Sequence, residues 1–162
     1  MRIMGIDPGS RATGYGVVDL SNSTLQRVAG GVIRCGTGSL ASRLARIDRE
    51  LSAMLVEIQP VAAALESVFS ARNPRSALQL GQARGVALAA CGRAGLEAAE
   101  YAPSQVKLAV VGHGAADKAQ VQRMVQRLLG LATPPPADEA DALAVAICHA
   151  HTDERAQRGL ER

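Results

Sequence analysis

A run of five apolar residues, residues 61–65 (VAAAL), lies near the middle of the chain. A short uninterrupted run of this kind is typical of a strand that is buried on both faces, as in sheets with helices on either side. The run ends at Glu66, an acid that needs either a partner or exposure at the edge of the sheet. The sequence therefore predicts an α/β protein with an acid at the end of a central strand.

Three further strands are predicted before this run, at residues 1–7, 14–20 and 25–34. The turns between them are short, so they are expected to form an antiparallel meander. Strands and helices then alternate, which indicates one mixed five-stranded sheet with helices on both faces. The predicted helices cover residues 40–58, 76–91, 118–129 and 138–150, and the remaining strand covers residues 95–101.

The length of 162 residues corresponds to one domain, here placed at residues 1–152 with a frayed polar tail at residues 153–162. Aromatic residues make up only 2% of the chain, so Ala, Val, Leu and Ile must build the core. The uncharged apolar stretches are shorter than the ~18 residues of a membrane span. Three scattered cysteines fit a reducing compartment. A cytoplasmic protein without a membrane partner is expected.

Charge is distributed unevenly along the chain. Residues 67–127 contain eight Lys or Arg and three Asp or Glu, whereas residues 128–162 contain three and six. A basic middle beside an acidic end favours a polyanionic partner and a separate carboxylate cluster. The alternative is an ordinary solvated surface.

Four acids are candidates for that cluster. Asp7 and Glu66 each end a predicted strand, and they would emerge side by side if those strands are neighbours. Asp138 and Asp141 are three residues apart and share one face of the last helix. Oxygen donors in this number suit Mg²⁺ or Mn²⁺, and two such ions can cleave a phosphodiester. Alternatively, Asp7 is a turn residue, and the helix dipole explains the other two aspartates.

Five residues are candidates for binding DNA. Phe69, the only phenylalanine, is followed by Arg72 and Arg75 in a basic loop where an aromatic ring could stack on bases. The alternative places Phe69 in the core. Lys107 and Lys118 are the only lysines among 18 Lys and Arg. Their positions could require the compact charge of an ammonium group for contact with phosphates. The alternative is that the two lysines occur there by chance.

A stripe of small residues is predicted on the second helix. Gly81, Gly85 and Ala89 are four residues apart and leave one helix face nearly bare. A bare face allows another backbone to approach closely. Either a second copy of the chain or another segment of the same chain could provide it.

Five segments match one known family in the same order along the chain: residues 5–16 (GIDPGSRATGYG), 66–73 (ESVFSARN), 77–87 (ALQLGQARGVA), 101–107 (YAPSQVK) and 137–144 (ADEADALA). Through them the chain resembles the RuvC family, the bacterial Holliday junction resolvases, over essentially its whole length to about His151. The resemblance implies a ribonuclease-H-like fold and a metal-dependent endonuclease that places paired nicks in a four-way junction, with two Mg²⁺ per site and Mn²⁺ as a substitute. It also implies a homodimer and the RuvA–RuvB branch-migration complex as a partner.

The resemblance also assigns roles to residues. It implies that the four catalytic acids of the family fall on Asp7, Glu66, Asp138 and Asp141, with Asp138 at a position where some members have His. From the placement of these carboxylates, we hypothesise that Asp7 bridges the two ions, that Glu66 and Asp141 complete their shells, and that Asp138 holds or deprotonates the attacking water. The junction-contacting aromatic and the functional lysines of the family fall on Phe69, Lys107 and Lys118.

Two other functions stay open at this point. A RuvX (YqgF)-type nuclease that acts on ribosomal RNA precursor shares a similar Gly-Ile-Asp-Pro-Gly start. A non-catalytic junction-binding module is the second alternative, although the intact acids argue against it.

Overall fold

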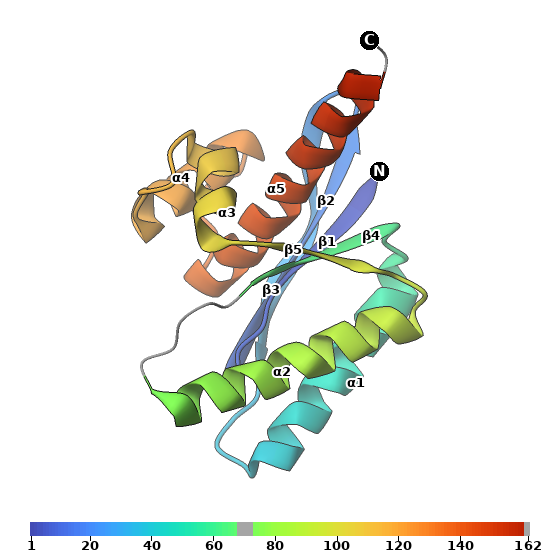
Figure 1. The fold of residues 1–162 in the computed structure, drawn as a ribbon, viewed down its shortest axis with the longest axis vertical. Helices are drawn as coiled ribbons and strands as arrows, with labels where there is room; N and C mark the ends of the chain where they lie inside the picture. The colour runs from blue at the N-terminus through green and yellow to red at the C-terminus, as the bar shows by residue number, and fades with distance from the viewer. Residues whose placement is uncertain (68–72, 161–162) are drawn as a thin grey trace.

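The computed structural model describes residues 1–67 and 73–160, which form a five-stranded sheet with helices on both faces (Figure 1). The order across the sheet is β3-β2-β1-β4-β5. Strands β1, β2 and β3 are antiparallel neighbours, whereas β1, β4 and β5 run parallel, so the predicted mixed sheet is confirmed. The strands are β1 (Arg2–Asp7), β2 (Ala12–Ser21), β3 (Thr24–Arg34), β4 (Ala62–Glu66) and β5 (Ala98–Tyr101).

The two faces of the sheet carry different helices. Side chains alternate between the faces along β1, so that Met4 and Ile6 pack toward α1 and α2 while Ile3 packs toward the other three helices. Along β4, Leu65 faces the first group and Ala64 the second. The helices are α1 (Leu40–Ile58), α2 (Pro74–Arg93), α3 (Pro103–Val111), α4 (Lys118–Leu128) and α5 (Ala137–Leu160).

Two helix starts follow the expected capping chemistry. The backbone N–H of Ser42 donates to Oγ of Ser39 at 3.2 Å at the start of α1. At the start of α4, Asp117 and Gln120 each accept a hydrogen bond at 2.8 Å from the other's backbone N–H. These bonds satisfy backbone donors that the helix itself leaves free.

The structure differs from the sequence prediction in three places. Helix α3 was not predicted, although it begins at Pro103 and stops at Gly112, which is left-handed with φ 92°. The last helix continues past the predicted end at residue 150 to Leu160. Residues 153–160, which were predicted to belong to a frayed tail, are therefore part of this helix. Val61 lies outside β4 and is 66% exposed. No helix within residues 1–67 and 73–160 has the length and apolar character to cross a membrane.

Helix α5 lies directly on the sheet because a row of glycines crosses three strands. Gly5 of β1 pairs with Gly16 of β2, which pairs with Gly30 of β3. A Cβ on Gly5 would lie 2.1 Å from the carbonyl oxygen of Ala142, and one on Gly16 would lie 2.6 Å from Cγ of Leu143. Only glycine permits this approach between a helix backbone and a sheet.

At Gly30 the same row makes room for a buried acid. A Cβ there would lie 2.5 Å from Oε1 of Glu139, whose side chain is 7% exposed. The guanidinium of Arg27 on β3 donates to this carboxylate at 2.9 Å through Nε. Removing a charge from water is costly unless it is paired, so Arg27 compensates the burial of Glu139.

Substituting Gly5 with Ala tests the contact between α5 and the sheet. Because the added methyl group would collide with the backbone of α5, we expect Gly5→Ala to lower the free energy of unfolding by about 2–3 kcal/mol in urea titrations. Gly92 is the control, because nothing lies within 4 Å of a Cβ there, and Gly92→Ala should be neutral or stabilise by up to ~1 kcal/mol. Equal unfolding midpoints for the two variants would contradict this packing.

Candidate active site at the ends of the parallel strands

The central parallel strands bring two predicted acids together. Ile6 of β1 and Leu65 of β4 are register partners, so Asp7 and Glu66 follow at the same edge of the sheet. Both acids occupy positions that alternate onto the α5 face, the face of Ile3 and Ala64. The expectation that these strands are neighbours is confirmed.

The start of α5 brings the other two acids to this edge. Gly14 is the register partner of Asp7 on β2, and a Cβ on Gly14 would lie 2.0 Å from the carbonyl oxygen of Asp138. The absence of that Cβ lets the first turn of α5 pack over Gly14, near the beginning of β2. Asp141 follows three residues later on the same side of the helix.

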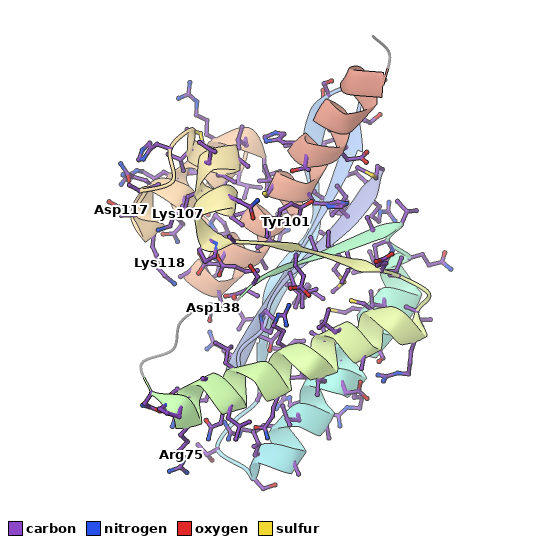
Figure 2. All side chains as sticks on the ribbon, in the orientation of Figure 1. Arg75, Tyr101, Lys107, Asp117, Lys118 and Asp138 are labelled. Carbon is purple, nitrogen blue, oxygen red and sulfur yellow. The ribbon has the colours of Figure 1, made fainter. Side chains whose placement is uncertain are left out.

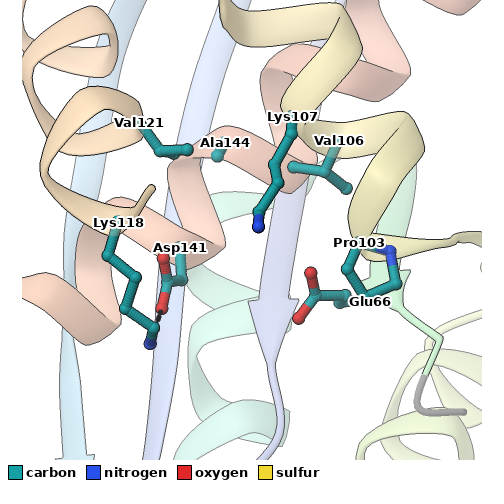
Figure 3. A pocket seen from close by; sticks show the side chains of 8 residues that line it. All are labelled: Glu66, Pro103, Val106, Lys107, Lys118, Val121, Asp141 and Ala144. Atoms are coloured by element: carbon teal, nitrogen blue, oxygen red, sulfur yellow. Dashed lines mark hydrogen bonds and ion pairs between the residues drawn. The ribbon is translucent and has the colours of Figure 1, made fainter. Parts of the chain in front are cut away.

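A cavity of about 210 Å³ lies between helices α3 and α4 and two of the four acids, Glu66 and Asp141, whereas Asp7 and Asp138 do not line it. Its polar residues are Glu66, Asp141, Lys107 and Lys118. Figure 3 shows the side chain of Lys107 extending from α3 toward the space between the two acids. Nζ of Lys118, itself largely exposed, donates to Oδ2 of Asp141 at 3.0 Å. The apolar lining consists of Pro103, Val106, Val121 and Ala144.

Burial and mutual repulsion perturb the acids. Burial raises the pKa of Asp7 to about 7, and the negative charges of Asp141, Glu66 and Asp138 add to the increase, while Lys118 opposes it. Burial also raises the pKa of Glu66, reinforced by Asp141 and opposed by the two lysines. Perturbed carboxyl groups beside a cavity are typical of functional sites.

The chemistry of the donors fits a hard divalent cation. All four groups offer carboxylate oxygens, the ligands that Mg²⁺ and Mn²⁺ prefer, and a cation would relieve the repulsion that acts on Asp7. Within residues 1–67 and 73–160, no three Asp, Glu, His or Cys side chains lie in an arrangement that would hold one metal ion. The ammonium group of Lys118 provides a positive charge beside Asp141 instead.

The predicted DNA-binding residues have different positions. Lys107 and Lys118 line the cavity, from α3 and from the start of α4 (Figure 2). Arg75 is exposed in the first turn of α2 and does not line it. Phe69 and Arg72 lie outside the described residues.

The apolar lining of the cavity was missed at the level of sequence. Pro103 and Val106 belong to the unpredicted helix α3, which also positions Lys107. The signs were a proline at a helix start, two valines four residues apart (Val106 and Val110) and a glycine at Gly112. A helix of nine residues offers too few periods for the pattern to stand out.

Comparison with known proteins places the chain in a family. The family model described as crossover junction endodeoxyribonuclease RuvC matches residues 3–149. A protein of that name from Alkalilimnicola ehrlichii is 55% identical over 150 residues, covering 93% of this chain and 91% of the relative. The chain belongs to the RuvC family. Another RuvC, from Pseudomonas putida, is 54% identical and covers 93% of this chain and 86% of its own length.

Solved structures agree with this assignment. A structure of Thermus thermophilus RuvC in complex with a Holliday junction substrate has a TM-score of 0.91 at 36% identity and covers 96% of each chain. The yeast mitochondrial Holliday junction resolvase is 15% identical, with a TM-score of 0.65 over 90% of this chain and 76% of its own, and shares the fold alone. The predicted ribonuclease-H-like sheet is therefore confirmed.

The raised pKa of Asp7 predicts how stability depends on pH in the metal-free protein. The folded state retains a proton on Asp7 that the unfolded chain releases near pH 4, so the free energy of unfolding should fall as pH rises from about 4 to about 7. Asp7→Asn should be more stable than wild type at pH 8 and should show a smaller fall, with Glu66 contributing the remainder. Thermal melting in EDTA across pH 4–8 measures both effects. Identical pH profiles for the two proteins would contradict the burial of Asp7.

Proposed function

We propose that this chain is a metal-dependent endodeoxyribonuclease that resolves four-way DNA junctions by nicking two opposed strands. Its membership of the RuvC family supports this function, as does its similarity to a RuvC structure that contains a Holliday junction. The observation that carries the proposal is Asp7, a carboxyl group whose pKa is raised by burial and by three neighbouring acids and lowered by Lys118. Such a site suits divalent ions and phosphate together.

The residues that would hold Mg²⁺ are the four acids. In this proposal Asp7, Glu66 and Asp141 would hold two ions between them, with Glu66 and Asp141 on opposite sides of the cavity. When bound, the ions supply a water of lowered pKa and polarise the phosphodiester. Mn²⁺ would satisfy the same oxygen donors.

The remaining side chains act on the water and the phosphate. Asp138, in the first turn of α5, would orient the attacking water and accept its proton. Lys107 and Lys118 would neutralise the phosphates next to the cut, because both line the cavity that Glu66 and Asp141 also line. In this role Lys118 would give up its bond to Asp141.

Paired cuts require two sites related by a two-fold axis, so we propose a homodimer. Helix α2 offers a face for it: nothing lies within 4 Å of a Cβ built on Gly81 or Gly85, and Ala89 continues this exposed row. Leu78, one turn before Gly81, is 64% exposed. Cooperation with RuvA and RuvB stays a prediction from the family.

The two alternative functions have less support. The relatives that share more than half of their residues with this chain over 93% of its length are named for crossover junctions, which speaks against an enzyme of the RuvX (YqgF) type. A non-catalytic binding module has no need for a buried cluster of repelling carboxylates, since the cluster reduces stability.

Asp7→Asn tests the chemistry apart from the binding. We expect this substitution to reduce Mg²⁺-dependent nicking of a synthetic four-way junction by about a thousandfold or more, while gel-shift affinity in EDTA stays near that of wild type. Asp48→Asn is the control, because Asp48 lies on α1 and pairs with Arg93 at the surface. A comparable cleavage rate for Asp7→Asn would rule out the metal site.

Lys107→Ala tests the phosphate contact. Loss of one phosphate contact should weaken junction binding about five- to tenfold at 0.1 M salt and reduce the slope of log K against log salt by about one. Arg123→Ala is the control, because Arg123 is exposed on α4 and does not line the cavity. If both variants keep the wild-type slope, Lys107 does not contact phosphate.

A further inference from the structure

Two more cavities lie at the same edge of the sheet, beside the turn between β1 and β2. One, of about 280 Å³, lies between this turn, the segment 36–38 and helix α1. The other, of about 460 Å³, lies between the turn and the first turns of α2. Arg11 lines both, and no acid lines either. The first is bordered by Arg11, Gly36, Thr37, Gly38 and Arg43.

The guanidinium group of Arg43 is held in place but not neutralised. Its NH1 donates to the carbonyl oxygen of Ser10 at 3.1 Å and approaches Oγ of Ser10 at 3.5 Å. Its Nε is buried and has no hydrogen-bond partner among the residues that the structure describes. No acid forms an ion pair with Arg43 among the described residues, so its positive charge at the edge of the cavity is uncompensated.

Arg11 provides a second guanidinium at the same cavity. Its side chain is exposed and has neither an ion pair nor a hydrogen bond within the described part of the chain. Its backbone is fixed, because the carbonyl oxygen of Arg11 accepts a hydrogen bond from the N–H of Cys35 at 2.9 Å. Two unneutralised arginines from two separate elements thus face one cavity, an arrangement suited to the several oxygens of a phosphate.

The cavity lies close to the cleavage site. Asp7 pairs with Gly14, and two residues before it Ala12 pairs with Arg34 at the end of β3. With about 3.4 Å per residue and about 4.8 Å between strands, the pair of Ala12 and Arg34 is on the order of 10 Å from Asp7. Phosphates of one DNA strand rise by about 3.4 Å each along the helix axis and lie farther apart along the backbone, so the distance corresponds to fewer than about three nucleotides.

We propose that Arg11 and Arg43 bind a backbone phosphate of the DNA arm, within about three nucleotides of the phosphate that is cut. The inference rests on the proposed function, and it adds a second contact on the opposite side of Asp7 from the lysines. The strand would pass from Lys107 and Lys118 over the acids to the arginines, so that phosphate contacts on both sides fix the register of the cut.

The test is the affinity of Arg11→Gln and of the double variant R11Q/R43Q for a fluorescent four-way junction. Binding is measured by anisotropy in EDTA between 50 and 200 mM salt, with a duplex of equal length as competitor. Loss of one phosphate contact should weaken binding by the double variant about five- to tenfold at 0.1 M salt and lower the salt slope by about one. Arg49→Gln is the matched control, because Arg49 is exposed on α1 and lines neither cavity.

The outcomes separate this inference from the proposed function. If wild type prefers the junction and R11Q/R43Q matches Arg49→Gln in affinity and slope, the phosphate site is overturned. If wild type shows no preference for the junction over the duplex, the proposed function fails instead. Arg11→Gln alone keeps the bond between Arg43 and Ser10, so it decides the question if the double variant melts below the assay temperature: a loss of at least about threefold supports the site, and no loss overturns it.

Discussion

The contact between helix α5 and the glycine row of the sheet is the constraint on which the site depends. Gly5, Gly16 and Gly30 have no side chains that would keep the helix away from the sheet. Gly14 likewise leaves room for the start of the helix. Backbone then packs directly on backbone. The first turn of α5 therefore reaches the ends of the central strands, where a helix packed at the ordinary distance would leave its acids out of range of Asp7.

This arrangement places like charges together at a cost in stability. Burial and repulsion raise the pKa of Asp7 to about 7, and Lys118 relieves only part of the repulsion through its bond to Asp141. The buried pair of Arg27 and Glu139 secures the same helix from its other side, one residue from Asp138. Clustered acids lower the stability of the fold, so favourable contacts elsewhere must compensate. This is expected at a site whose residues are selected for binding and not for stability.

Much of the fold could be predicted because its signals are local. The meander and the strand that ends at Glu66 each depend on a few neighbouring residues, and both were confirmed, although Val61 lies outside that strand. Helix α3 was not predicted because it is short. The apolar lining of the cavity and the placement of Lys107 were missed for the same reason. The extension of α5 was missed because a polar sequence says little about where a helix stops.

The sequence by itself determined the order of the strands and of every helix except α3, the four candidate acids and the family motifs. Strand ends and periodicity can be recognised from consecutive residues, so Asp7 and Glu66 could be identified as candidate acids without coordinates. Only the tertiary structure decided that Asp141 pairs with Lys118, that Glu139 is buried against Arg27 and that Arg11 meets Arg43 at one cavity. These contacts join segments far apart in the chain, and their geometry follows from how closely α5 and α1 pack on the sheet.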